Sequence, residues 1–187
     1  MRKRKFYSLL ILFIFFLIVK TTQLIERNKT VETIKINKIE ERENKKYSAL
    51  VTKVIDGDTI KVKFLEPVPE ELNIEETIRL IGINTPELNI HKSAPKEYFA
   101  QEAADFTNKC LNGKKVEIKT DKVSSLRDKY NRLVAYVYHE GFLFNKILIE
   151  EGYASYYPNF KFENENMFTF QKAERYAKDN KKGKWKK

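Results

Sequence analysis

The stretch "SALVTKVIDGDTIKVKFL", residues 48–65, contains two strand-like runs joined by a tight turn. Apolar and polar residues alternate in Ser48–Asp56 and again in Thr59–Leu65. Gly57 lies between the two runs, in an Asp-Gly-Asp sequence that favours a turn. Alternation with a period of two on both sides of a glycine-containing turn predicts a β-hairpin.

The rest of the chain extends this hairpin into a small mixed fold. Alternating apolar runs predict three further strands, at residues 77–83, 115–119 and 133–139. Helical spacing of apolar residues predicts three helices, at residues 96–111, 143–151 and 167–177. Three strands, a helix, two strands and then helices are typical of a Greek-key barrel. The predicted fold class is therefore α+β, a five-stranded OB-fold barrel with about three helices.

An apolar segment precedes this domain. Four basic residues at positions 2–5 lead into an apolar run, Phe6–Val19, that Lys20 closes. This is the form of an export signal, although no small-x-small cleavage site follows. The run is shorter than the ~20 residues of a typical spanning helix, but flanking lysines can extend their reach, so an uncleaved membrane anchor fits as well. Residues 1–20 are therefore predicted to be a signal peptide or a signal anchor.

Residues 21–46 are rich in Lys, Glu, Asn and Thr and contain no aromatic residue, so they are predicted to be a charged, partly helical tether. The globular domain then spans residues 47–187. A basic N-terminal flank stays in the cytoplasm, so we expect an extracellular or cell-surface domain.

Composition excludes several kinds of site. One cysteine rules out an internal disulfide, and one cysteine with two distant histidines rules out a His/Cys zinc centre. Oxygen ligands remain, and they favour calcium or magnesium. The net charge of +10 is uninformative about a partner, because residues 1–47 carry +7 of it and residues 48–187 only +3.

Three polar clusters could carry chemistry: "IDGDT" at 55–59, "RLIGINTPE" at 79–87 and "RDKYNR" at 127–132. Each also has a plain structural interpretation. The first is a turn, the second a strand with an edge or solvated arginine followed by a proline turn, and the third a solvated loop. The first cluster is not an EF-hand loop, because Ile60 and Lys61 stand where an oxygen ligand and a glycine are needed.

Taken together, the clusters resemble the thermonuclease family of staphylococcal-nuclease-like domains. Five blocks occur in the family's order, over residues 48–187: "VIDGDTIKV", "RLIGINTPE", "DKYNRLVAYVY", "LIEEGYA" and "KKGKW". Ordered blocks are more specific than any single motif. The resemblance implies an OB-fold barrel and calcium-dependent, sugar-nonspecific hydrolysis of DNA and RNA with 3′-phosphate products. It implies one calcium ion, no protein partner and a monomer.

The resemblance also assigns residues. Arg79 and Arg132 match the phosphate-binding arginines, and Glu87 matches the general base. Asp58 matches a metal carboxylate, and Thr85 matches a residue whose backbone carbonyl reaches the metal.

The resemblance extends to further positions. Lys129 and Tyr130 match nucleotide-contacting positions, and either Tyr156 or Tyr157 matches a ring-stacking tyrosine. Asn84 stands where well-known members carry a second metal-binding aspartate. An amide oxygen still coordinates calcium but brings no charge, so a looser calcium site is expected. Asp56 is expected to be a supporting ligand or to bond to one.

These residue types suit phosphodiester hydrolysis. A carboxylate can take a proton from water, and arginine forks match phosphate oxygens at any working pH. The segment 88–96 has no strand or helix pattern and is expected to be a mobile loop over the site.

Two other functions remain open. One is a nucleic-acid-binding module without catalysis, and the other is a surface protein whose main feature is its anchor. The expected partners are DNA and RNA, and the membrane if residues 6–19 are not removed.

Overall fold

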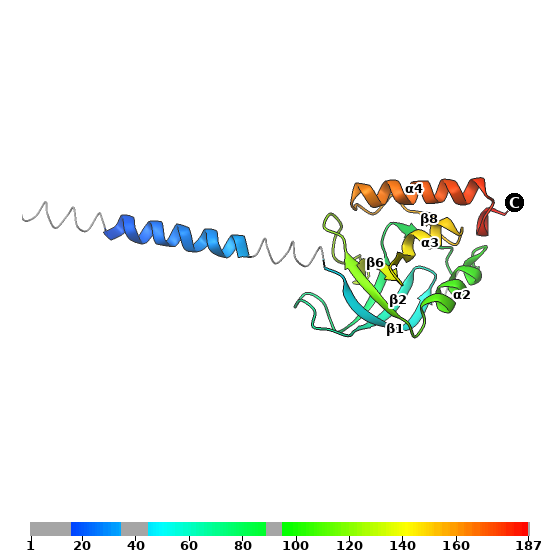
Figure 1. The fold of residues 1–187 in the computed structure, drawn as a ribbon, viewed down its shortest axis with the longest axis horizontal. Helices are drawn as coiled ribbons and strands as arrows, with labels where there is room; N and C mark the ends of the chain where they lie inside the picture. The colour runs from blue at the N-terminus through cyan, green and yellow to red at the C-terminus, as the bar shows by residue number, and fades with distance from the viewer. Residues whose placement is uncertain (1–15, 35–44, 89–94, 187) are drawn as a thin grey trace, which may run out of the picture. The chain divides into compact units, whose positions relative to one another are not determined.

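The computed structural model describes residues 16–34, 45–88 and 95–186 (Figure 1). The chain divides into two compact units, residues 1–41 and 42–187, and each is considered by itself. In the first unit, residues 16–34 form one helix, so part of the expected tether is helical. Most of the expected signal or anchor segment lies outside the described residues. No helix in the described ranges is both long enough and apolar enough to cross a membrane.

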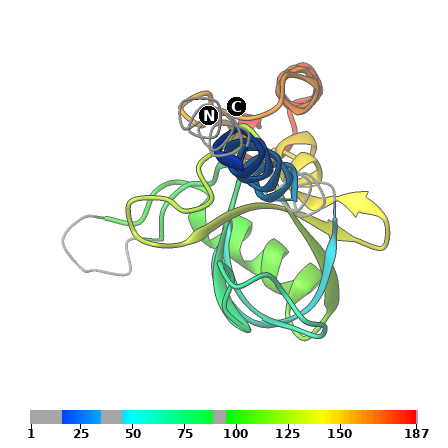
Figure 2. The same cartoon turned by 90° about the vertical axis from the view of Figure 1, so that its left-hand side faces the viewer.

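The second unit is built on five long strands. They are β1 (Tyr47–Asp56), β2 (Thr59–Phe64), β3 (Glu75–Leu80), β5 (Lys115–Thr120) and β6 (Leu133–His139). They are hydrogen-bonded in the order β3-β2-β1-β5-β6, and a parallel pairing of β3 with β6 closes the barrel. Figure 2 shows the strands curving into a ring. The predicted five-stranded OB-type barrel is confirmed.

Short elements complete the unit. Strand β4 (Ile83–Asn84) pairs with β8 (Ser155–Tyr156), and β7 (Phe142–Leu143) pairs with the end of β6. The helices are α2 (Ala100–Leu111), α3 (Phe144–Glu150) and α4 (Asn164–Asp179), followed by a 3₁₀ turn, η1 (Gly183–Trp185). Alternate residues of the strands point inward and are buried, as in Val51, Ile60 and Ile118. The core is therefore the barrel interior together with the inner faces of α2, α3 and α4.

Two predicted boundaries are wrong for the same physical reason. The run 77–83 is two strands, because Gly82 adopts a φ of 73° and turns the chain between β3 and β4. The helix expected from residue 96 begins at Ala100, because Phe99 adopts a φ of 69°, which no α-helix contains. In both places a residue in the left-handed region interrupts a run that the apolar pattern alone would continue.

A buried asparagine holds the turn after β3. The side chain of Asn145, on α3, accepts a hydrogen bond from Val137 N at 2.9 Å and donates one to Ile81 O at 3.0 Å. A fully buried amide is tolerated only when its polar atoms are paired in this way. The bonds tie α3 to β6 and to the segment that leads into β4.

Candidate active site

The turn between β1 and β2 packs directly against the segment after β4. A Cβ at Gly57 would lie 2.8–2.9 Å from the side-chain atoms of Thr85, so only glycine permits this approach. From the other side, Thr107 of α2 donates its hydroxyl to Gly57 O at 2.7 Å. The turn is therefore held between α2 and Thr85, and it places Asp58 beside β4.

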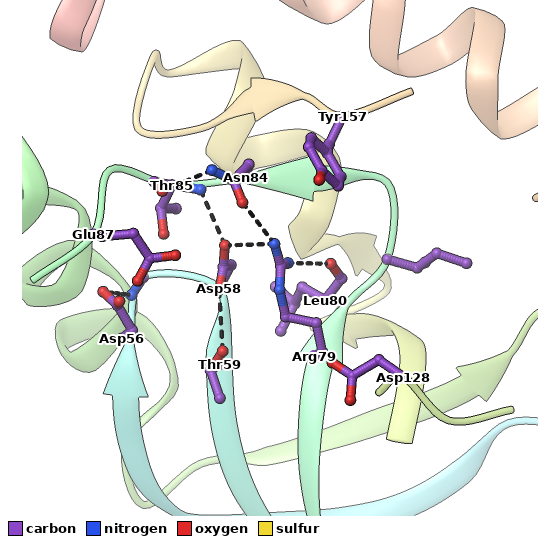
Figure 3. Close-up of polar contacts among 12 residues, drawn as sticks. Asp56, Asp58, Thr59, Arg79, Leu80, Asn84, Thr85, Glu87, Asp128 and Tyr157 are labelled. Carbon is purple, nitrogen blue, oxygen red and sulfur yellow. Dashed lines mark hydrogen bonds and ion pairs between the residues drawn. The ribbon is translucent and has the colours of Figure 1, made fainter. Parts of the chain in front are cut away.

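Asp58 lies at the centre of the polar cluster (Figure 3). Its Oδ2 accepts a hydrogen bond from Thr85 N and forms an ion pair with Arg79 Nη2, both at 3.0 Å. Its Oδ1 accepts a hydrogen bond from Thr59 Oγ1 at 3.0 Å. These partners compensate the burial of the carboxylate, whose side chain is 5% exposed.

Arg79 is buried, which excludes the solvated or edge role considered above. Its side chain is 6% exposed. Besides the ion pair with Asp58, Nη1 donates to Leu80 O at 2.8 Å and Nη2 donates to Asn84 Oδ1 at 2.9 Å. The ring of Phe160 lies 5.6 Å from the guanidinium carbon. Strand β3, its neighbours and this ring hold the guanidinium in one orientation.

Asn84 joins the arginine to the neighbouring backbone. Its Oδ1 accepts from Arg79, and its Nδ2 donates to Thr85 O at 3.2 Å. Each of these two oxygens has two lone pairs, so each retains one after this bond. Asn84 and Thr85 O can therefore still bind a cation.

Glu87 is exposed, beside the buried Asp56 (Figure 3). Its backbone is fixed by Glu97, since Glu87 N donates to Glu97 Oε2 at 3.0 Å and Glu97 N donates to Glu87 O at 3.1 Å. These two bonds close the segment 88–96, of which residues 89–94 lie outside the described residues. The expected loop over the site is thus largely outside them too.

Asp56 shows the electrostatic character of this corner. Burial, together with the charges of Asp58 and Glu87, raises the pKa of its carboxyl to about 6, against the hydrogen bond from Gly57 N. The negative charges of Asp58 and Glu87 beside the Asp56 carboxyl favour a cation at this corner of the site.

Arg132 approaches the same carboxylate from the other side. Its Nη1 donates to Thr59 Oγ1 at 3.2 Å, and that hydroxyl donates to Asp58 Oδ1. The other two nitrogens of the Arg132 guanidinium are held by Asp128, whose Oδ2 lies 2.7 Å from both Nε and Nη2. The two predicted arginines therefore flank Asp58, one in direct contact and one through Thr59.

The predicted nucleotide-contacting residues border Arg132. The ring of Tyr130 is 67% exposed and lies 5.3 Å from the guanidinium carbon of Arg132. Lys129 Nζ lies 4.9 Å from the centre of the same ring. The arrangement leaves an aromatic face open to solvent next to two positive charges.

The structure separates the two candidate tyrosines. Tyr156 lies on β8 and packs edge-on against Phe162. The ring of Tyr157 lies on the Arg79 and Asn84 side of the site (Figure 3), and it contacts Phe160. Tyr157 is thus the candidate whose ring Figure 3 shows beside the polar cluster.

The oxygen donors fit a hard cation with few charged ligands. In the described ranges, no group of three or more His, Cys, Asp or Glu side chains is arranged to hold a metal ion. A cation here would rely on Asp58 with the neutral oxygens of Asn84 and Thr85, an all-oxygen set that suits calcium.

Several contributing residues were not singled out from the sequence. Thr59 and Asp128 stand inside the quoted motifs, but only the fold shows that they connect Arg132 to Asp58. Glu97 and Phe160 lie outside every motif, and no sequence pattern marks them.

Comparison with known proteins agrees with the fold. A family model described as "Staphylococcal nuclease homologue" matches residues 77–187. The chain is 34% identical to a thermonuclease of Staphylococcus hyicus, over 72% of this chain and 73% of that protein. It is 36% identical to a thermonuclease of Staphylococcus intermedius, over 62% of this chain and 64% of that protein.

A relative outside the staphylococci has a related name. The chain is 34% identical to the SPbeta prophage-derived endonuclease YokF of Bacillus subtilis, over 72% of this chain and 43% of that protein. The shared region is thus one part of a longer chain in that case.

Proposed function

Because this chain belongs to the staphylococcal nuclease family, a family of generally metal-dependent nucleases, we propose that it is a calcium-dependent, sugar-nonspecific nuclease. It is a hydrolase of phosphodiester bonds. We propose that it needs calcium, that it cleaves both DNA and RNA, and that its products carry a 3′-phosphate. The observation that carries it is the position of Asp58 between Arg79 and the Thr59–Arg132 pair, with Glu87 beside it.

The two arginines would bind the scissile phosphate. Arg79 and Arg132 come from different elements and flank one carboxylate, so a phosphate there receives donors from two sides. A fork of fixed N–H donors stabilises the charge that develops on the phosphate oxygens without reorganising solvent. The exposed ring of Tyr130 would stack on a nucleobase, a contact that tolerates any base.

Glu87 would act as the general base. A water molecule attacks phosphorus and gives its proton to the Glu87 carboxylate, the bond to the 5′-oxygen breaks, and that oxygen takes up a proton as it leaves. The phosphate then remains on the 3′-oxygen. Asp58, Asn84 and Thr85 O would hold one calcium ion, which when bound supplies positive charge to a non-bridging phosphate oxygen. None of these groups distinguishes ribose from deoxyribose.

A digestion assay tests the proposal. The purified chain is incubated with plasmid DNA and with RNA, in calcium, in EDTA, and in calcium with Glu87→Gln. We expect cleavage of both polymers in calcium only, and a loss of several powers of ten in kcat for Glu87→Gln. Band shifts in EDTA without any cleavage in calcium would instead assign the chain to the binding modules.

We also propose that the domain acts outside the cytoplasm, as the basic residues 2–5 and the apolar run 6–19 support. A calcium site with few charges needs about millimolar calcium, which is available there. Cell fractionation tests this, since detection of the chain only in the cytoplasm would contradict it.

A further inference from the structure

We propose that an ion pair outside the site, Glu76 with Arg127, positions Arg132 for its role on the phosphate. Neither residue touches Asp58, Arg79 or Glu87 in the described structure. The inference rests on the proposed function, because it assigns to Arg132 a contact with substrate. Glu76 and Arg127 are positioning residues and not catalytic ones.

Glu76 is a buried carboxylate with an organised set of donors. It lies on β3, three residues before Arg79, and is 7% exposed. Arg127 binds it with both arms of its fork, Nη2 to Oε1 at 2.6 Å and Nη1 to Oε2 at 3.0 Å. Asn73 adds its backbone N–H at 2.8 Å and its Nδ2 at 2.9 Å, both to Oε1. A two-pronged pair of this kind fixes orientation as well as distance.

Arg127 also holds two loop carbonyls. Its Nη2 donates to Glu71 O at 3.1 Å, and its Nη1 donates to Asn131 O at 3.2 Å. Glu71 belongs to the connection between β2 and β3, while Asn131 belongs to the loop before β6. One guanidinium therefore fastens the loop 127–132 to β3 and to the connection that precedes it.

That loop has little freedom once Arg127 is in place. Arg127 and Leu133 form an antiparallel bridge across its base. Inside it, Asp128 N donates to Arg132 O, and Asn131, with a φ of 62°, donates its N–H to Asp128 O at 3.0 Å. The Asp128 carboxylate then binds the backbone and side chain of Arg132.

The chain of contacts ends at the site. Arg132, held by Asp128, reaches Thr59 Oγ1 and through it Asp58. If the ion pair is lost, the loop stays attached to the barrel mainly through its own ends. Its internal bonds then no longer fix where the Arg132 fork lies relative to Asp58. A misplaced donor loses most of its effect on a transition state.

An ion pair that only stabilises the fold and an ion pair that positions Arg132 lead to different effects on kcat. Variants of the full chain distinguish these two roles. The test variant is Arg127→Met, which keeps an unbranched apolar stem and removes the charged fork. Arg127→Lys keeps the charge but not the two-pronged geometry. The control is Lys46→Met, which removes the ion pair of 3.1 Å between Lys46 and Glu117. Lys46 directly precedes the first residue of β1, whereas Asp56 is the last residue of that strand.

We expect Arg127→Met to lower kcat about 10- to 100-fold, below the full effect of removing a transition-state donor. Arg127→Lys should restore part of that loss, and Lys46→Met should change kcat less than about twofold. In an Arg132→Ala background, Arg127→Met should change kcat little further, because the group that it positions is already absent. Equal losses in both backgrounds would overturn the proposal.

A second measurement does not depend on activity. The Nε–H of Arg132 donates to Asp128 in this structure, so its NMR signal should be protected from exchange with solvent. Arg127→Met should remove that protection, and Lys46→Met should not. Unchanged protection in Arg127→Met would overturn the positioning role. If the wild type showed the protection but failed to cleave nucleic acid, the proposed function alone would fail.

Discussion

At the scale of single residues, the site is one carboxylate shared by several donors. Asp58 binds Thr85 N, Thr59 Oγ1 and Arg79, so its position is set by β2, by β3 and by the segment after β4. A carboxylate with this many partners is locked in place but also partly neutralised. A cation that binds Asp58 must therefore share it with Arg79.

The substitution Asn84→Asp should tighten calcium binding. It adds a second negative charge to a set that has one firmly placed carboxylate, and hard cations respond to the ligand charge. We expect half-maximal cleavage at a calcium concentration about tenfold lower than in the wild type. A calcium titration of activity measures this, and a wild type that needs less calcium than Asn84→Asp would contradict it.

The substitution Asp56→Asn should stabilise the metal-free protein at neutral pH. The folded state holds the Asp56 proton up to about pH 6, against an ordinary pKa of 3.8, so the unfolded state loses it first. Stability therefore falls as the pH rises from about 4 to about 6, by an upper limit of about 3 kcal/mol. The asparagine side chain in the variant Asp56→Asn has no proton to lose, so the variant does not undergo this fall in stability.

Urea unfolding in EDTA measures the effect of Asp56→Asn. The variant should exceed the wild type by about 1–3 kcal/mol at pH 7, and the difference should disappear near pH 4. A difference that stays constant over this pH range would show that the charge of Asp56 is not its cause.

At the scale of elements, the C-terminal turn docks by backbone contact. Lys184 N donates to Gly152 O at 3.0 Å, and a Cβ at Gly152 would lie 2.3 Å from Lys182 O. Lys184 Nζ also reaches Ser155 Oγ at 2.5 Å, on the strand that pairs with β4. The end of the chain thereby supports the strand pair that includes Asn84.

Gly152→Ala should therefore destabilise the fold far more than an alanine at another left-handed glycine. It combines a positive φ of 77° with a clash against backbone, and about 3 kcal/mol or more is expected. The control is Gly113→Ala, at a φ of 72° with no atom within 4 Å of the added Cβ, which should cost about 1 kcal/mol. Thermal or urea unfolding gives both values, and equal losses would contradict the close-contact argument.

At the scale of the whole molecule, the barrel brings together segments that are far apart in the chain. The parallel pairing of β3 with β6 aligns Arg79 with Val134, two residues after Arg132. Closure of the barrel therefore places both arginines close together. The turn between β1 and β2 brings Gly57 and Asp58 to them, and the segment after β4 brings Thr85 and Glu87. Residues 1–41 form a separate unit that contributes none of these groups.

Much of this could be read from local pattern. The hairpin of residues 48–65, the five strands and the order of the motifs follow from alternation, turn residues and spacing, which are local properties of the chain. The acid, amide and arginine types in the three clusters also indicated the chemistry, because their charge and donor geometry do not depend on the fold. The roles of Asp58, Arg79, Glu87 and Arg132 came from the resemblance that the ordered motifs carry, and the structure brings these four residues together at one site.

Only the tertiary structure decided how these residues are connected. Three findings depend on contacts between residues far apart in the chain. Arg79 is buried and paired with Asp58, 21 residues away, and Thr59 connects Asp58 to Arg132, 73 residues from Thr59. The ring of Tyr157 lies on the side of Arg79 and Asn84. The same holds for the Glu76–Arg127 pair, whose members are separated by 51 residues. A local pattern reports what a segment prefers by itself. The partner of a side chain depends on the closure of the barrel, which brings together residues that are distant in the sequence.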